Sequence, residues 1–490
     1  MSAIPSQNRC VEIATQAKPQ AFSVLEIDLG DFMVDVKVLR AKVKTCLNAL
    51  DSRRPIVFGD KPLIAGGEDE SLYVEGLHGG NKSKDLIRIL SDRIDFDEGG
   101  GTYLFSGNRG TGKTTELMRL TRILREQGCE VFYVDMVEYL NLTMSVEITD
   151  FLISVLGGFS EKIEERFGKN PAKVGFFERV GNFLQSEVKV EGLELGAGGG
   201  DVKANLKMSL QQDPTFKERL QDATRGHVAR LAQEARSFVE QAIAEIRSNT
   251  SPDKKIVLIV DSVERLRGVG NNQDIAKIFK SAETLFSGSD DMLHFQSLHM
   301  VCTIPPYLSA LAGSLAARYS GGQIYRLPSV HIYEERPLEG KEPVQSPEGL
   351  STMLQIVNKR FPEWPEFFAR EQLIRLAASS GGDLRDFFRM VDLCIVQSLY
   401  QKSLPLPDSE IESAEYALLN DMPLANDDRE LLGRIRRSHQ QELDSLNKLP
   451  DFARLTEGKY ILIYRNGKEW FDVHPLLRTI VPVAKDTNGA

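Results

Sequence analysis

The chain has 490 residues, enough for roughly three domains of about 150 residues each. Its apolar content of 41% and charged content of 27% are ordinary for a globular protein. We expect a cytoplasmic protein, because no apolar run approaches the roughly 18 residues of a membrane span and the N-terminus does not resemble a secretion signal. The net charge of −10 disfavours a protein that coats nucleic acid with its whole surface, and five scattered cysteines without a C-x-x-C pair disfavour a disulfide framework or a zinc site.

Residues 1–65 are predicted to form an N-terminal extension of unknown role. Within it, Val24–Asp28 has the composition of a strand, and Val36–Leu50 has the apolar spacing of a helix. Pro55 and Pro62 then interrupt the chain.

Residues 66–335 are predicted to form the next domain. A short apolar run at Leu72–Val74 suggests a strand, and Asp85–Ile94 has a helical pattern. The apolar run Tyr103–Phe105 then leads into a glycine-rich turn.

This turn matches the phosphate-loop pattern G-x-x-x-x-G-K-[ST]. Its glycines let the backbone fold around a phosphate with several N–H groups pointing inward, and the next helix adds the positive end of its dipole. An incidental strand–helix turn is the alternative, but strand, loop and helix occur in the required order. The sequence therefore predicts an ATP site contacted by Gly107, Asn108, Arg109, Gly110, Thr111, Gly112, Lys113, Thr114 and Thr115.

In a phosphate loop, the lysine reaches the outer phosphates and the hydroxyl that follows it ligates Mg²⁺. Lys113 and Thr114 occupy these positions. Asp261 ends the buried strand Ile256–Val260, so we predict that Thr114 and Asp261 hold the metal. Glu264 is the candidate to orient or deprotonate the attacking water. The alternatives are a strand-end turn residue for Asp261 and a solvated surface acid for Glu264.

Three further residues are weaker candidates. Thr303 ends the strand Met300–Ile304, where its hydroxyl could bond the attacking water, or it is simply a β-branched strand residue. Arg385 follows two glycines at the start of a helix and could bind the γ-phosphate, or it is an exposed helix arginine. Arg318 could project toward the nucleotide of a neighbouring subunit, or it has no such role.

Short apolar strands that alternate with helices predict an α/β fold with a parallel sheet. The further strands are expected at Val131–Asp135, Ile256–Val260, Met300–Ile304 and Ile324–Leu327. A charged helical insertion is expected at about 160–250, interrupted by the glycine-rich stretch Gly196–Gly200 and containing one long amphipathic helix, Phe216–Ser248. Its apolar stripe either packs on the core or pairs with a partner in a coiled coil.

After the core, residues 336–403 are predicted to form a helical unit, and residues 404–490 a final unit. The final unit is expected to contain helices at Ile411–Asn420 and Arg429–Asn447 and a hairpin with strands Tyr460–Tyr464 and Glu469–Val473. Asn466-Gly467 between two apolar strands is a strong hairpin signal.

Together, GNRGTGKT and SGGDLRDF resemble the AAA+ ATPases, especially the branch of origin-recognition-complex-like initiators, and the neighbouring STAND ATPases are also similar. The resemblance covers roughly residues 70–490. It implies a P-loop NTPase core, a lid at 336–403 and a winged-helix-like unit at 404–490. It also implies that Thr303 is sensor 1, Arg385 is sensor 2 and Arg318 is a candidate arginine finger.

Ser262 departs from the AAA+ pattern, because a glutamate commonly follows the Walker B aspartate there. The spacing from Asp261 to Glu264 is closer to the STAND type, so hydrolysis is expected to be slow or stimulated by a partner. Arg385 departs from the STAND pattern, which usually lacks it.

The first functional hypothesis is an ATP-dependent switch or assembly ATPase that requires Mg²⁺ and acts on its own oligomer or on an effector protein. The segment Asp253–Leu266 also resembles ATPases of anti-phage defence loci, which suggests antiviral defence. The alternative is a DNA-binding regulator of replication initiation or transposition that uses residues 404–490, where Arg465 and Lys468 could contact phosphate. A small-molecule kinase lacks an acceptor-site signal.

Overall fold

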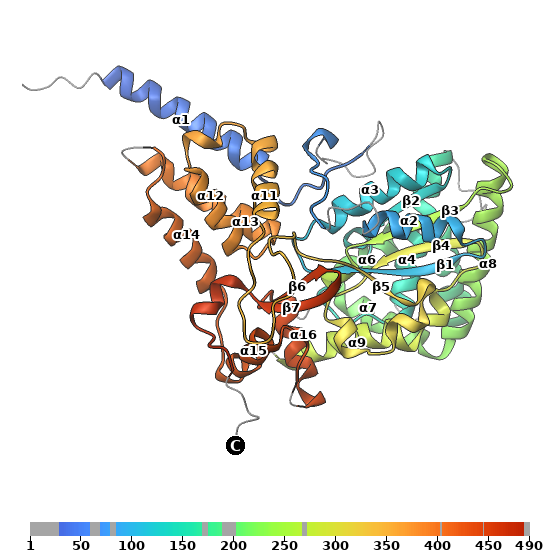
Figure 1. Cartoon of the computed structure of the whole chain (residues 1–490). Helices are drawn as coiled ribbons and strands as arrows, with labels where there is room; N and C mark the ends of the chain where they lie inside the picture. Colours follow the sequence, from blue (N-terminus) through green and yellow to red (C-terminus); the bar gives the residue numbers. More distant parts are fainter. Residues whose placement is uncertain are drawn as a thin grey trace, which may run out of the picture.

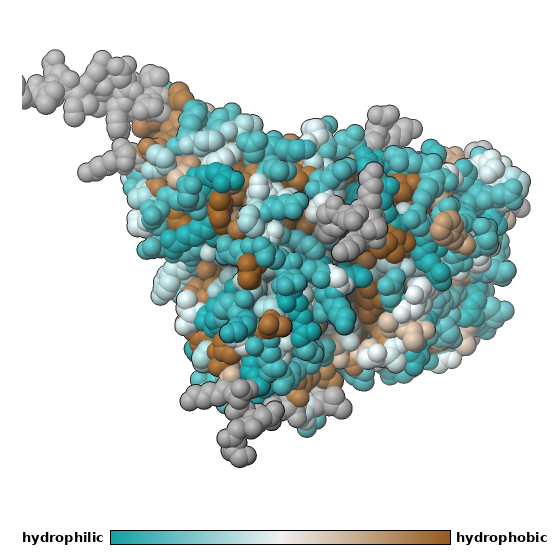
Figure 2. All heavy atoms as spheres, viewed as in Figure 1, coloured by the Kyte–Doolittle hydropathy of each residue, from teal (hydrophilic) through white to brown (hydrophobic). Residues whose placement is uncertain are grey.

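The computed structural model describes residues 29–58, 69–78, 85–168, 175–188, 202–266, 272–401, 404–443 and 445–484. The expected strand Val24–Asp28 and the glycine-rich stretch Gly196–Gly200 lie outside the described residues. In the described ranges, no helix is long and apolar enough to cross a membrane. Most of the surface on the face shown in Figure 2 is hydrophilic, in line with the 27% of charged residues.

A five-stranded parallel sheet forms the centre of the first body of the molecule, on the right in Figure 1. Its strand order is β2-β3-β4-β1-β5. The strands are β1 (Gly101–Gly107), β2 (Glu130–Asp135), β3 (Ile256–Asp261), β4 (Leu298–Thr303) and β5 (Ile324–Leu327). Because β4 lies between β1 and β3 and all three strands are parallel, their carboxyl ends lie side by side at one edge of the sheet. The predicted α/β class and P-loop NTPase sheet are confirmed.

Alternate residues of the strands face two separate apolar cores, as expected for a sheet that is buried on both faces. On one face, Tyr103 and Phe105 pack with α2 (Leu86–Phe96) and α3 (Lys113–Glu126). On the other face, Leu104 packs in a core that a second group of helices forms. These are α4 (Ile148–Phe167), α5 (Phe176–Phe183), α6 (Val202–Gln212), α7 (Pro214–Thr224), α8 (Val228–Asn249), α9 (Asn272–Gly288) and α10 (Leu308–Leu311).

The expected long helix Phe216–Ser248 is wrong in one respect: it is broken into α7 and α8 by a 3₁₀ turn at Arg225–His227. Gly226 within this turn weakens a continuous helix. Most of the apolar stripe is nevertheless buried, including Leu231 and Phe238, in the same core as α4. The stripe therefore packs on the core, and the coiled-coil alternative is not needed to explain it.

The second body, on the left in Figure 1, consists of helices. They are α1 (Leu29–Ala49), α11 (Pro347–Arg360), α12 (Arg370–Ser379), α13 (Leu384–Gln397) and α14 (Asp408–Asn420). Helix α1 packs on α13, and its Cys46 is fully buried there. The expected strand at Leu72–Val74 is wrong, because a 3₁₀ turn, Glu70–Leu72, occupies this position.

The last unit contains α15 (Asn426–Ser438), α16 (Leu449–Glu457), β6 (Ile461–Asn466) and β7 (Lys468–Val473). The hairpin prediction is confirmed. The expected helix Arg429–Asn447 is too long, because α15 ends at Ser438 and His439 takes a left-handed conformation with φ of 52°. The interpretation as a winged helix stays a prediction.

The hairpin is tied to the linker that joins β5 to α11, the first helix of the predicted lid. Ser329 N–H donates to Ile463 O at 3.0 Å, and the Asn466 side-chain amide donates to Tyr333 O at 2.8 Å. The Tyr464 hydroxyl donates to Gly381 O at 2.8 Å. A hairpin that is tethered along its length in this way does not favour the DNA-binding alternative.

Gly381 and Gly382 lie just before α13 and form a joint, where the lid packs against this linker. Both have positive φ angles, 63° and 80°, which L side chains rarely adopt. A Cβ on Gly382 would lie 2.4 Å from Val330 O, and Val330 N–H donates to Gly382 O at 3.0 Å. The joint therefore requires glycine for both its conformation and its close contact.

We predict that Gly382→Ala lowers the free energy of unfolding by about 3 kcal/mol, from backbone strain together with the steric clash. Gly313→Ala is the control, because a Cβ there meets no atom within 4 Å. It should change stability by less than about 0.5 kcal/mol. Urea unfolding of both variants measures the difference, and equal midpoints would contradict the prediction.

Candidate nucleotide-binding site

The phosphate loop connects β1 to α3 through two glycines with left-handed backbones. Gly110 has φ of 97° and Gly112 has φ of 90°, so the loop turns sharply before the helix begins at Lys113. A Cβ on Gly110 would lie 2.7 Å from both Arg385 Cβ and Asp383 Oδ1. Gly110 is therefore needed for its conformation and for the approach of the lid.

Lys113 and Thr114 lie as the sequence predicts, at the first turn of α3. The Lys113 ammonium is 3.0 Å from the carbonyl oxygens of both Gly107 and Asn108 and 3.5 Å from Glu264 Oε1. The Thr114 hydroxyl donates to Asp261 Oδ2 at 2.8 Å. The ends of β1 and β3 thus bring a hydroxyl and a carboxylate together, as a magnesium site requires.

Asp261 is fully buried and accepts three hydrogen bonds. Besides Thr114, the Tyr133 hydroxyl donates at 2.8 Å and the Ser262 N–H donates at 2.6 Å. Burial and the nearby Glu264 carboxylate raise the pKa of Asp261 to about 6, although the hydrogen bond from Tyr133 acts in the opposite direction. Sequence reasoning missed Tyr133, although its place near the end of the β2 run was a usable signal.

Glu264 is carried by a tight turn after β3. Ser262 begins this turn with φ of 67°, and the Val263 N–H donates to Thr303 Oγ1 at 3.0 Å. The Thr303 hydroxyl also lies 3.4 Å from Val260 O, so Thr303 braces the turn. Its role toward water stays a prediction.

Arg385 and Arg318 have different surroundings. Arg385 lines the same cavity as Lys113 and Glu264. Arg318 pairs with Asp290 at 3.1 Å. It lies near Ser320, which contacts the start of β1, at the opposite end from the phosphate loop. The structure therefore brings together all five predicted catalytic residues but not Arg318.

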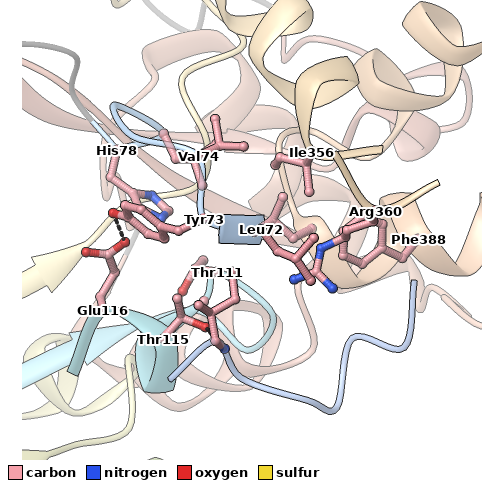
Figure 3. Close-up of a pocket in the computed structure, with 14 residues that line it drawn as sticks. Leu72, Tyr73, Val74, His78, Thr111, Thr115, Glu116, Ile356, Arg360 and Phe388 are labelled. Atoms are coloured by element: carbon pink, nitrogen blue, oxygen red, sulfur yellow. Dashed lines mark hydrogen bonds between the residues drawn. The ribbon is translucent and has the colours of Figure 1, made fainter. Parts of the chain in front are cut away.

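A small apolar pocket of about 50 Å³ adjoins the loop (Figure 3), well below the range of about 300–1,000 Å³ for small-molecule sites. Its apolar walls are Ile56, Leu72, Val74, Leu77, Ile356, Leu384 and Phe388. Polar groups line the rest, including Thr111, Thr115 and the Tyr73 hydroxyl, which donates to Glu116 at 2.7 Å. Sequence reasoning missed this pocket, because its walls come from segments far apart in the chain.

The segment after α1 crosses the cavity and reaches α3. Asp51, Ser52, Arg53, Arg54 and Pro55 line the cavity, and Ile56 N–H donates to Thr115 Oγ1 at 3.1 Å. Thr115, predicted to contact nucleotide, thus also anchors this segment. The N-terminal extension contributes directly to the walls of the site.

The residues present fit a bound Mg²⁺–nucleotide. Glu264 Oε2, Arg385 Nε and both polar atoms of the Asn108 side chain are buried without a hydrogen-bond partner in the described part of the chain. Such atoms cost free energy unless another molecule satisfies them. The glycine loop supplies N–H groups, Lys113 supplies charge, and Thr114 with Asp261 supplies the oxygen ligands that Mg²⁺ prefers.

Asp392 on α13 is an unexpected acid in this cavity. Its Oδ1 is buried without a hydrogen-bond partner among the described residues. Burial raises the pKa of Asp392 to about 7, and the nearby Asp51 carboxylate contributes. The folded protein therefore binds a proton at Asp392 that the unfolded chain releases above about pH 4.

We predict that stability falls between about pH 4 and pH 7 through this group, because its folded-state pKa lies above the unfolded value. Asp392→Asn cannot ionise, so the variant should gain stability relative to wild type at pH 8 compared with pH 5. Denaturant unfolding at both pH values tests this, with the exposed Asp253→Asn as control. Parallel pH curves for wild type and Asp392→Asn would contradict it.

No protein-family model and no curated protein matches the chain. Among solved structures, it is similar to the ORC2 protein of Aeropyrum pernix, solved with ADPNP and ADP, at 9% identity and a TM-score of 0.37, covering 83% of this chain and 93% of that one. It is also similar to Cdc6p from Pyrobaculum aerophilum, at 10% identity and a TM-score of 0.34, covering 84% and 97%. A Walker-type ATPase of Pyrococcus abyssi matches at 11% identity and a TM-score of 0.35, covering 84% and 99%. The likeness is distant, and the fold assignment rests on the strand order and the phosphate loop.

Proposed function

We propose that this chain is an ATP-binding and ATP-hydrolysing AAA+/STAND-like regulatory ATPase that acts as a nucleotide-dependent switch or assembly factor. The observation that carries the proposal is the convergence of three regions on one cavity. The phosphate loop contributes Lys113, the end of β3 contributes Asp261 and Glu264, and the lid contributes Arg385.

In this proposal, the triphosphate lies along the loop N–H groups with Lys113 on the outer phosphates. The purine lies against Leu384 and Phe388 in the cavity of about 1070 Å³ that the phosphate loop also lines, where burial of its faces is favourable. Thr114 and Asp261 hold Mg²⁺, which supplies a counter-charge to the phosphates. Tyr133 keeps the Asp261 carboxylate oriented.

Glu264 orients and deprotonates the attacking water. Its Oε1 lies 3.5 Å from the Lys113 ammonium, and its Oε2 has no hydrogen-bond partner among the described residues and is the atom that would accept the proton of the water. Ser262, which is not an acid, directly follows Asp261. The proposed base, Glu264, comes three residues after Asp261, so we expect slow turnover.

Arg385 distinguishes ATP from ADP in this proposal, because a guanidinium can pair with a γ-phosphate and ADP has none. Helix α13, which carries Arg385, packs on α1 and α14, so its position can be transmitted to the lid surface. We propose that the output is an oligomer of this chain or an effector protein. The resemblance of Asp253–Leu266 to anti-phage ATPases supports a role in prokaryotic defence.

We predict that Lys113→Ala weakens ATP binding by about 10- to 150-fold, because it removes a charge-assisted contact to phosphate. Titration calorimetry with Mg²⁺–ATP measures this loss. Lys277→Ala, which replaces a side-chain lysine 75% exposed on α9, is the control. Wild-type affinity in a folded Lys113→Ala variant would refute the nucleotide site.

We predict that Glu264→Gln lowers the ATP turnover rate by about 10²- to 10⁴-fold while it retains ATP binding, as expected when a general base is lost. Phosphate release measures turnover, and the exposed Glu240→Gln serves as control. If Glu264→Gln turns over ATP at the wild-type rate, Glu264 is not the base and the base lies elsewhere.

A further inference from the structure

A buried cluster of charges joins the C-terminal unit to the first turn of α13. The Lys459 ammonium lies 2.8 Å from Asp383 Oδ1 and 3.0 Å from Asp386 Oδ1. His474 Nε2 lies 3.8 Å from Asp386 Oδ2. The side chains of Asp383 and Lys459 are 0% and 11% exposed, so this pair is screened little by water.

Lys459 reaches this position from a backbone that few residues adopt. Its φ of 64° is left-handed, which is unfavourable for a residue with a side chain. Such conformations persist only where the surroundings enforce them, and they cluster at functional sites. Lys459 lies two residues before β6, so the hairpin determines where its ammonium lies.

The cluster borders the phosphate loop. A Cβ on Gly110 would lie 2.7 Å from Asp383 Oδ1 and 3.0 Å from Asp383 Oδ2, so this carboxylate rests against the loop. Without a positive partner, it would repel a phosphate bound there.

The two carboxylates also flank Arg385 in the sequence, at positions 383 and 386, yet they pair with Lys459. Arg385 Nε has no hydrogen-bond partner among the described residues. A guanidinium next to two buried carboxylates would normally pair with one of them. Lys459 binds one oxygen of each carboxylate, and the second oxygen of each, Oδ2, has no hydrogen-bond partner among the described residues. The positive charge of Lys459 thus lowers the attraction of both carboxylates for the Arg385 guanidinium.

We propose that Lys459 is a positioning residue: by holding Asp383 and Asp386, it keeps Arg385 available for the outermost phosphate of a nucleotide. This inference rests on the nucleotide binding proposed above. It makes the C-terminal unit part of the nucleotide sensor and assigns a function to the hairpin other than reading nucleic acid.

The electrostatics of the cluster agree with this assignment. Burial raises the pKa of Asp383, and the Lys459 charge opposes this rise, so the ammonium favours the ionised form of this buried acid. Burial also acts to raise the pKa of Asp386, but the nearby His474 side chain and the Lys459 charge hold it at about 2.

The test is a double-mutant cycle on the ratio of affinities for a non-hydrolysable ATP analogue and for ADP. Arg385→Ala should lower this preference for ATP by about 10- to 150-fold, because a charge-assisted phosphate contact is lost. Lys459→Met should lower it over the same range, since Asp383 or Asp386 then captures Arg385. The double variant should show no additional loss, because both changes remove one interaction.

A charge-balanced variant serves as readout if Lys459→Met fails to fold. Lys459→Met/Asp383→Asn removes one competing carboxylate, and asparagine still caps α13 by accepting from the Asp386 N–H, as Asp383 does at 3.0 Å. It should recover most of the wild-type preference for ATP. Lys448→Met, a surface lysine of the same unit that pairs with Asp451 at 3.4 Å, is the control and should retain the full preference.

Several results would overturn the inference. A folded Lys459→Met protein with the wild-type preference would do so, as would additive losses in the cycle or a charge-balanced variant that recovers nothing. An unchanged preference in Arg385→Ala would also overturn it while leaving ATP binding intact. A wild-type protein that binds neither nucleotide would instead refute the proposed function itself.

Discussion

The contact on which the site depends is the close approach of the phosphate loop to the start of α13. A Cβ on Gly110 would lie 2.7 Å from atoms of both Asp383 and Arg385, so only a residue without a side chain permits this distance. Loop and lid therefore form one continuous wall of the cavity. A bound phosphate that displaces the loop would also displace the lid, because packed interiors have little free volume to absorb a shift.

A second contact of the same kind lies immediately before α13 in the sequence. Gly381 and Gly382 pack against Leu462 and Val330, and the Tyr464 hydroxyl bonds Gly381 O at 2.8 Å. The first turn of α13 is thus held between the phosphate loop and the hairpin. It has little freedom to move alone, so any response to nucleotide would move the lid and the hairpin together as packed bodies. A tethered hairpin therefore suits the proposed switch better than it suits a projecting DNA-reading wing.

Sequence reasoning was sufficient where the signal is local. The buried apolar runs predicted all five strands of the parallel sheet. Because parallel strands end at one edge, the sequence also placed Asp261 and Thr303 near the phosphate loop. It failed where helices break without a strong breaker, as at His439, whose left-handed conformation is unusual for a residue other than glycine. Gly226 was a usable signal for the break before α8. The apolar pocket and Lys459 depend on segments far apart in the chain, and a periodic pattern in one segment carries no information about such contacts.

The net charge of −10 does not predict how the cavity interacts with an anion, because single charged groups near the cavity decide this. Three acids at or beside the cavity have their charge offset locally. Asp261 receives three hydrogen bonds, Asp383 faces Lys459, and burial raises the pKa of Asp392 to about 7, so that it is partly protonated near neutral pH. If these acids were uncompensated, they would repel a polyphosphate at short range, where screening by salt is weakest. Lys113 and Arg385 can then act on the charge of a ligand with less competition from these three acids. Compensation that comes from the C-terminal unit, as at Lys459, makes the affinity of the cavity for anions depend on the docking of that unit.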